Sequence, residues 1–248
     1  MSTVELEEAR AAAMGSAEKR AYVRGMFEAI APRYDLLNRV FSLTRDRAWR
    51  QKAIGALDIS RRPDGVYLDL CAGTLDVASA IARLDGFRGE VIGADFAEPM
   101  LRLGKPKAQG LRVAPVTADA LALPLADRSC AGAIVAFGIR NVIDLDAALR
   151  EVRRVLEPGA RFAILEFTTP HNAIVRAGFR AYSHFVLPRV GALVSGHGSA
   201  YTYLPVSIDH FPEERALGER MSAAGFGGVS WETMMLGVVA LHTGTREK

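Results

Sequence analysis

Apolar and polar positions follow two different periods along this chain. Between residues 16 and 57 the apolar side chains recur at helical spacing, with a break at Pro32. Further along, short apolar runs alternate with helical stretches. The predicted strands are Val66–Leu70, Glu90–Asp95, Arg112–Val116, Ala133–Phe137 and Arg161–Phe167. Because strands that alternate with helices form right-handed βαβ crossovers, the pattern predicts an α/β fold with a doubly wound, mostly parallel sheet.

The pattern changes after Pro170. A last helix is predicted over Pro212–Ala224, followed by two strand-like runs, Val229–Met234 and Gly237–His242, which are close enough to pair as an antiparallel hairpin. The expected organisation is an N-terminal helical lid over residues 1–60 and a sheet domain over residues 61–248. That domain carries an insertion at about residues 171–210.

Composition narrows the function classes. The formal net charge of +3 comes from arginines scattered among apolar residues, which does not favour a nucleic-acid partner. No secretory signal and no membrane-spanning run is recognisable, so a cytoplasmic location is expected. Cys71 and Cys130 lie far apart in apolar contexts, which is typical of reduced core cysteines. The histidines do not share one helix face, so no metal site is expected.

Candidate chemistry begins at the end of the first predicted strand, between Asp69 and Asp76. Gly73 and its small neighbours let the backbone approach a ligand, and the following helix presents its N–H groups there. A nicotinamide-binding turn would carry G-x-G-x-x-G, whereas this turn has Gly73 followed by Thr74. Asp69 would repel a pyrophosphate and attract a sulfonium or ammonium group. A cationic cofactor is therefore favoured over a dinucleotide.

Two further strand ends carry acidic residues. Asp95 ends the second strand, 22 residues after Gly73, where a carboxylate accepts both ribose hydroxyls. Asp119 and Ala120 follow the third strand and are placed to meet an adenine edge. Three such features at successive strand ends predict a nucleoside-containing ligand.

Several blocks resemble the UbiE/MenG family of ubiquinone/menaquinone biosynthesis C-methyltransferases over nearly the whole chain. Two blocks are specific to that family, Phe137-Gly138-Ile139-Arg140-Asn141 and Tyr201-Thr202-Tyr203-Leu204-Pro205-Val206-Ser207-Ile208. Further matches are residues 26–38, Trp49-Arg50, the Asp69–Asp76 turn, residues 154–159, Leu165-Glu166-Phe167 and residues 237–242. The glycine turn alone is shared by all class I methyltransferases.

The resemblance implies a class I, Rossmann-like methyltransferase that uses S-adenosylmethionine to methylate a ring carbon of a polyprenylated quinol. By position, the family's cofactor contacts fall on Thr74, Asp95, Asp119 and Ala120, with backbone access at Gly73. Tyr34 matches the lid over the cofactor. A family contact that is usually Ser falls on Ala136, which has no side-chain hydrogen bond to offer.

Methylation of a quinol requires a group that favours the ring oxyanion, because a phenol has a pKa near 10. Arg140 is the best candidate, with Asn141 fixing the pocket; the competing interpretation of Arg140 is a structural salt bridge to Asp144 or Asp146. Tyr201 and His184 are further pocket candidates, each with a core or surface alternative. No definite general base is recognisable.

The isoprenoid tail of such a substrate needs an apolar route. Residues 174–193 mix apolar, aromatic and arginine side chains, as an interfacial helix does and as an ordinary packed helix also can. Peripheral contact with the inner face of a membrane is therefore an open expectation. The sequence specifies neither the oligomeric state nor the choice between a naphthoquinol and a benzoquinol.

Three departures from the family keep a scaffold without turnover as an alternative. They are Leu75 and Thr44, where Gly is expected, and Cys130-Ala131, where Phe-Asp is usual. Leu75 matters most, because a left-handed backbone would cost a leucine roughly 1–2 kcal/mol. We expect Leu75 to keep a negative φ and to point into the helix–sheet packing, away from the cofactor.

Overall fold

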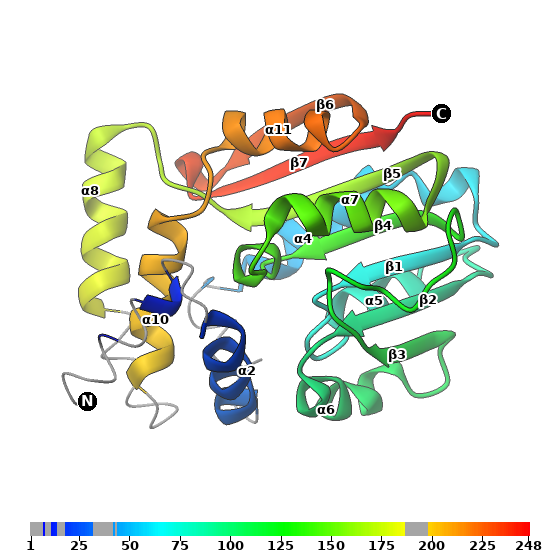
Figure 1. The fold of residues 1–248 in the computed structure, drawn as a ribbon, viewed down its shortest axis with the longest axis horizontal. Helices are drawn as coiled ribbons and strands as arrows, with labels where there is room; N and C mark the ends of the chain where they lie inside the picture. Colours follow the sequence, from blue (N-terminus) through cyan, green and yellow to red (C-terminus); the bar gives the residue numbers. More distant parts are fainter. Residues whose placement is uncertain (1–6, 8–10, 14–17, 32–41, 43, 187–197) are drawn as a thin grey trace.

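The computed structural model of the 248-residue chain describes all residues except 1–6, 8–10, 14–17, 32–41, 43 and 187–197. The described part contains one seven-stranded sheet in the order β3-β2-β1-β4-β5-β7-β6 (Figure 1). The strands are β1 (Val66–Leu70), β2 (Glu90–Asp95), β3 (Val113–Thr117), β4 (Cys130–Ala136), β5 (Leu156–Phe167), β6 (Phe226–Met234) and β7 (Val239–Arg246).

Strands β1 to β5 are parallel, and β7 pairs antiparallel with both β5 and β6. The predicted doubly wound sheet with a C-terminal antiparallel hairpin is thus confirmed. Strand order reverses between β1 and β4, so the carboxyl ends of these two strands flank the switch point where such sheets bind ligands.

Strand β5 begins earlier than predicted. Its pairing with β4 starts at Leu156, opposite Cys130, and resumes at Arg161 after an irregularity in the register. Pro158 and Gly159 therefore lie inside the strand, with Gly159 at φ +83°. A residue with this backbone is typical of a bulge, which period-2 patterning does not reveal.

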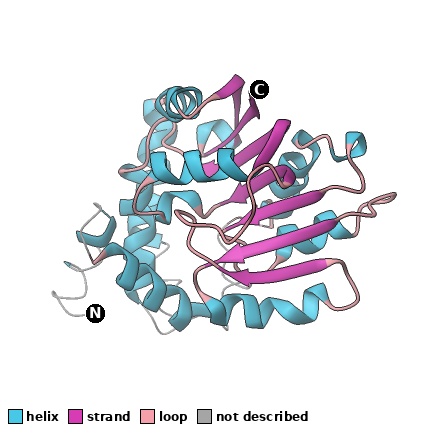
Figure 2. Cartoon of the chain, turned by 45° about the vertical axis from the view of Figure 1, so that its right-hand side comes forward, coloured by secondary structure: helices cyan, strands magenta, loops and turns pink. Residues whose placement is uncertain are grey.

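Helices cover both faces of the sheet (Figure 2). One face packs against α4 (Asp46–Ala56), α5 (Asp76–Ala82) and α6 (Glu98–Ala108), and the other against α7 (Leu145–Val155) and α11 (Glu214–Ala223). The central strands are buried on both sides, which explains their continuous apolar runs. Because β1 to β5 are parallel, the loops that follow them lie at one edge of the sheet.

The remaining elements gather at that edge. They are α2 (Lys19–Ile30), the short helix η3 (Ile139–Asn141), α8 (Ala173–Ala181) with η4 (Tyr182–Val186), and α10 (Gly198–Asp209). Helices α2 and α10 contact each other, and the rings of Tyr22 and Tyr203 lie 5.8 Å apart. The two helices of the predicted lid region occupy different places, because α4 packs in the core through Trp49 while α2 lies at the edge. A short 3-10 helix, η2 (Ile59–Arg61), leads into β1, and another, η5 (Met235–Gly237), joins β6 to β7.

Candidate active site

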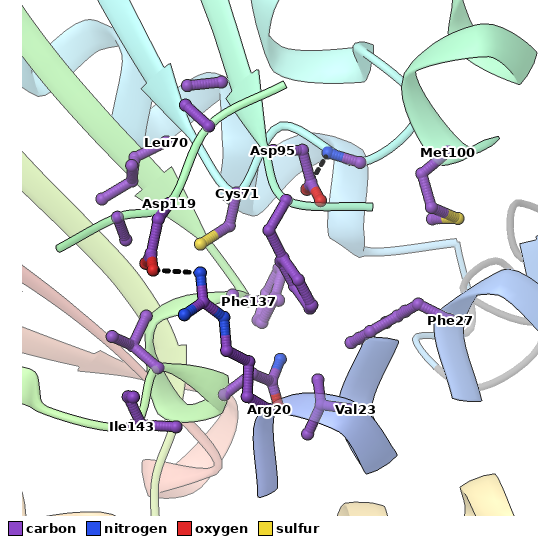
Figure 3. A pocket seen from close by; sticks show the side chains of 18 residues that line it. Arg20, Val23, Phe27, Leu70, Cys71, Asp95, Met100, Asp119, Phe137 and Ile143 are labelled. Carbon is purple, nitrogen blue, oxygen red and sulfur yellow. Dashed lines mark hydrogen bonds and ion pairs between the residues drawn. The ribbon is translucent and has the colours of Figure 1, made fainter. Parts of the chain in front are cut away.

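A pocket opens at the carboxyl ends of β1, β2 and β4 and is bordered by α2 (Figure 3). It holds about 740 Å³ of empty space including its mouth, within the roughly 300–1,000 Å³ usual for small-molecule sites. Of the predicted cofactor contacts, Gly73, Asp95, Asp119 and Ala120 line it together. These four residues follow three different strands, so the sheet itself brings them to one place.

The turn after β1 has an unusual backbone. Cys71, Gly73 and Leu75 all have positive φ, at 55°, 51° and 62°. Only glycine adopts this region without a steric cost, and strained backbone of this kind is concentrated at ligand sites. The turn also presses against the loop after β4, because Gly138 faces Cys71 with no room for a Cβ.

The carboxylate of Asp95 fixes this turn to β2. One oxygen accepts from the Gly73 amide at 2.8 Å, and the other accepts from the Ala97 amide at 2.8 Å. Burial raises the pKa of Asp95, and the backbone amides partly oppose that rise. Each carboxylate oxygen can accept a second hydrogen bond, so Asp95 can hold the turn and bind a hydroxyl pair at once.

Asp69 lies behind the pocket. Its side chain is buried and accepts from the Ala78 amide at 2.9 Å, inside the first turn of α5. Burial raises its pKa to about 7, against the opposing effects of that amide and of Arg50. Asp69 does not line the pocket, so the predicted direct role at the cofactor remains a prediction. What the structure shows is a carboxylate that anchors the helix.

Thr74 also faces away from the cavity. Its hydroxyl accepts from Nζ of Lys107 at 2.8 Å, and the same ammonium lies 2.7 Å from Asp76. Asp76 pairs in addition with Arg50 at 2.9 Å. Thr74 thus ties the turn to α6. It is not among the residues that line the pocket, so its contact with the cofactor remains a prediction.

Leu75 corrects one expectation and supports another. The predicted negative φ is wrong, because Leu75 is left-handed at φ +62°. Its side chain is fully buried and does not line the pocket. Gly93 and Gly104 make room for it, since a Cβ on either residue would meet the Leu75 side chain at 2.5 Å or 2.9 Å. A bulky residue therefore fills the space behind the turn and leaves the cavity open. Thr44, the second non-glycine departure, is also left-handed at φ +63°.

Asp119 is contacted by a residue of α2, which lies in the predicted N-terminal lid. Its carboxylate forms an ion pair with Arg20 of α2 (Figure 3). One of its oxygens also accepts from the Leu121 amide at 3.0 Å. The neighbouring Lys19 is buried and donates to the carbonyl oxygens of Arg140 and Val142 at 3.0 and 3.1 Å. Two adjacent cations thus join α2 to two different loops that line the pocket, and the sequence patterning did not point to either.

Arg140 has a different partner from those considered. Its guanidinium lies 2.7 Å from Glu166, with both side chains buried, and 5.6 Å from the centre of the Phe167 ring. The proposed partners are engaged elsewhere: Asp144 caps α7 and Asp146 pairs with Arg220. Burial raises the pKa of Glu166, and the positive charge of Arg140 opposes this. Arg140 lines a neighbouring groove and is not among the residues that line the cofactor cavity.

Asn141 lines the pocket and is held from behind. The hydroxyl of Tyr203, which is buried, donates to its Oδ1 at 3.1 Å. This hydrogen bond leaves the amide NH₂ free to donate toward a ligand. Glu166 and Tyr203 both lie in the family-like blocks, which is the signal that could have found them.

The other predicted pocket residues lie apart from this cavity or outside the described residues. Tyr34 lies outside the described residues, and for Tyr201 only the backbone, in α10, is described. His184 is on η4, where its Nε2 is 3.4 Å from Asp209, and it does not line the pocket. Within the described ranges, no group of three or more metal-binding side chains is placed to hold an ion.

Comparison with known proteins shows the family of this chain. The model of the ubiE/COQ5 methyltransferase family matches residues 14–246. The chain belongs to this family. A demethylmenaquinone methyltransferase of Thermus thermophilus is 46% identical over 224 residues, covering 89% of this chain and all of that protein. The ubiquinone/menaquinone biosynthesis C-methyltransferase UbiE of Syntrophotalea carbinolica is 44% identical, covering 90% and 93%.

Solved structures support the class I fold of this methyltransferase. The [4+2]-cyclase SpnF superposes with a TM-score of 0.67 at 19% identity, covering 91% of this chain and 96% of that one. An S-adenosylmethionine-dependent methyltransferase of Thermotoga maritima gives 0.61 at 17% identity, covering 90% and 99%. A cyclase and a methyltransferase share the fold, so the site and the family carry the functional argument.

The pocket fits the cofactor of a class I methyltransferase, and the enzyme uses S-adenosylmethionine. Two carboxylates line the cavity, Asp95 and Asp119. These acceptors suit a ribose diol and an adenine amino group. The left-handed backbone at Gly73 lets the main chain approach the ligand closely.

Proposed function

We propose that this methyltransferase methylates a ring carbon of a polyprenylated quinol in respiratory quinone biosynthesis, with a demethylated naphthoquinol as its first substrate. The proposal rests on the family match over residues 14–246 and on the printed names of relatives at 40–46% identity, several of which are demethylmenaquinone methyltransferases. Other relatives are named for both ubiquinone and menaquinone, so a benzoquinol is the second candidate.

The chemistry requires an electron-rich ring. S-adenosylmethionine, when bound, supplies an electrophilic methyl group. The new C–C bond replaces a ring hydrogen, so the ring carbon must be nucleophilic and a proton must leave. A quinone is electron-poor, whereas the reduced quinol reacts, most readily as its phenolate. The protein therefore needs to hold the ring near the methyl group and to favour the oxyanion.

Asn141 carries the site argument. Its amide NH₂ points away from the Tyr203 hydroxyl, which the Oδ1 accepts, and it can donate to a quinol oxygen in the pocket. Arg140, next to it, brings a permanent cation to the same loop. The guanidinium is buried against Glu166, so we infer that it stabilises the quinol oxyanion without touching it. It would act through its charge or through one bridging water.

Turnover on reduced, short-tailed analogues tests the proposal. We expect methylation of the naphthoquinol analogue under reducing conditions and none of the oxidised quinone. Arg140→Ala should reduce kcat by at least tenfold while calorimetry shows an unchanged affinity for S-adenosylmethionine. Arg150→Ala, on the exposed side of α7, is the matched control. Cofactor binding without turnover on either ring type would favour the alternative of a scaffold in a quinone-synthesis assembly.

The substrate also implies a location. A polyprenyl tail partitions into a bilayer, so the proposal includes peripheral contact with the cytoplasmic face of a membrane. Among the described residues, no helix has the length and apolar character needed to cross one.

A further inference from the structure

Helix α8 presents an apolar stripe to solvent. None of its residues is buried, and its outward positions recur at helical spacing: Ile174, Ala177, Gly178, Ala181 and, on η4, Phe185. Ile174 is 84% exposed and Phe185 is 62% exposed. An amphipathic helix in a globular protein normally turns its apolar stripe toward the core. Here that stripe faces outward, which indicates a partner.

The tip of the β6–β7 hairpin adds a second apolar element at the same edge. Leu236 is 78% exposed, and Met235 next to it is also exposed. Both residues have positive φ, at 59° and 51°, so the backbone holds the tip in a strained conformation.

The tip lies beside the segment that leads into α8. Val238 accepts from the Thr168 amide at 2.9 Å, and a Cβ on Gly237 would lie 3.4 Å from Pro170 (Figure 1). Strand β5 delivers this segment to the carboxyl edge of the sheet, where the cofactor pocket opens. We call the stripe and the tip together the α8–hairpin face.

Helix α8 and η4 carry basic side chains and no acidic ones of their own. Residues 173–186 contain Arg176, Arg180 and His184 and no Asp or Glu. Arg180 and His184 share a single carboxylate, Asp209, at 3.6 and 3.4 Å. Arg176 has no ion-pair partner within the part of the chain that the structure describes. The face is therefore apolar and cationic together, which is the combination that binds anionic lipid surfaces.

We propose that the α8–hairpin face docks on a bilayer that contains anionic phospholipids. The inference rests on the proposed function in one respect: a quinol with a polyprenyl tail stays in the bilayer, and docking would turn the carboxyl edge of the sheet toward it. A second copy of the chain is a poorer occupant, because two such faces would bring like charges together. Ile174 and Leu236 are separate protruding side chains. Such side chains insert among lipids more readily than they pack against the flat surface of a second protein.

Vesicle flotation without quinol or cofactor tests docking independently of catalysis. The full chain is mixed with vesicles of phosphatidylcholine alone or with about one third phosphatidylglycerol. We expect it to float with the anionic vesicles and to be released at high salt, because salt screens the arginines. The double variant Ile174→Asp/Leu236→Asp should bind at least tenfold less, since each side chain would otherwise be buried among lipids. Leu84→Asp, an exposed leucine after α5, is the matched control and should float normally.

Three outcomes would overturn the proposal: no flotation of the wild-type chain, equal flotation with neutral vesicles, or equal flotation of the double variant. A dimer in sedimentation analysis that Ile174→Asp converts to a monomer would instead assign the face to a second copy. The double variant should still methylate a short-tailed quinol in solution at the wild-type rate, while its rate on a long-tailed quinol in vesicles falls. Failure of the short-tailed reaction in the wild-type chain would count against the proposed function alone.

Discussion

Two loops meet at the switch point of the sheet, and they are held by different means. Each begins with a left-handed residue directly after its strand, Cys71 after β1 and Phe137 after β4. The turn after β1 is fixed by carboxylates that accept from backbone amides, Asp69 from Ala78 and Asp95 from Gly73. The loop after β4 is fixed by side chains from distant segments.

The second loop depends on partners that are far away in the sequence. Glu166 holds Arg140 from β5, and Tyr203 holds Asn141 from α10. The difference matches the tasks that we propose for the two loops: the first keeps a backbone shape around the cofactor, whereas the second aims functional groups at a substrate. Backbone shape is encoded locally, while the orientation of a buried cation depends on the whole fold. Four changes test this comparison.

The largest expected effect is on the second loop. Glu166→Ala leaves the buried guanidinium of Arg140 unpaired, which should lower the free energy of unfolding by about 3–5 kcal/mol. Urea denaturation measures this loss. Replacing both partners, Arg140→Met with Glu166→Leu, should restore most of the stability because no buried charge remains.

The same double variant separates positioning from structure. If the pair acts in catalysis, the variant binds S-adenosylmethionine and stays inactive. Wild-type turnover by the double variant would show that the Arg140–Glu166 pair only supports the fold.

The second effect concerns the first loop and pH. Burial raises the pKa of Asp69 from 3.8 to about 7, so the folded chain holds a proton that the unfolded chain releases. The free energy of unfolding should therefore fall by roughly 4 kcal/mol as the pH rises from about 4 to 7, because Asp69 loses its proton. Above pH 7 this contribution stays lost. Asp69→Asn removes this dependence and keeps an oxygen for the Ala78 amide.

Urea denaturation of both proteins at pH 4.5 and pH 7.5 checks the sign. The variant should gain stability relative to the wild-type chain at the higher pH. If the wild-type chain instead gains stability relative to Asp69→Asn between these two pH values, the Ala78 amide and Arg50 lower the pKa of Asp69 more than burial raises it.

The positions of the carboxylates at the strand ends could be predicted from the sequence, but the left-handed backbone of Leu75 and the partners of the second loop could not. The strand ends at Asp69, Asp95 and Asp119 lie where parallel strands must deliver them, so local patterning suffices. Glu166 is 26 residues from Arg140, whereas the partners that local spacing predicts are the acids nearest in sequence, Asp144 and Asp146. No local pattern indicates that β5 turns a carboxylate toward the loop after β4. The specific pairing depends on tertiary packing.

The third effect tests whether the backbone of the first loop needs its carboxylate. Asp95→Ala removes two hydrogen bonds to backbone amides and the proposed acceptor for the ribose, so affinity for S-adenosylmethionine should fall about 100-fold, or roughly 3 kcal/mol. Calorimetry measures the loss. Glu90→Ala, an exposed acid at the start of the same strand, is the control and should bind normally. A weakening of less than tenfold in Asp95→Ala would show that the left-handed turn keeps its shape unaided.

The smallest effect tests the cost of the left-handed leucine itself. Leu75→Ala and Leu75→Gly both leave a cavity against Gly93 and Gly104, and both should destabilise the chain. Alanine keeps the Cβ that conflicts with φ +62°, whereas glycine relieves it. The glycine variant should therefore be the more stable of the two by about 1 kcal/mol, the reverse of their order inside a helix. Urea denaturation of the two Leu75 variants measures this difference in the free energy of unfolding. If alanine is better tolerated, the strain at Leu75 is small, and packing alone explains why this turn accepts a leucine.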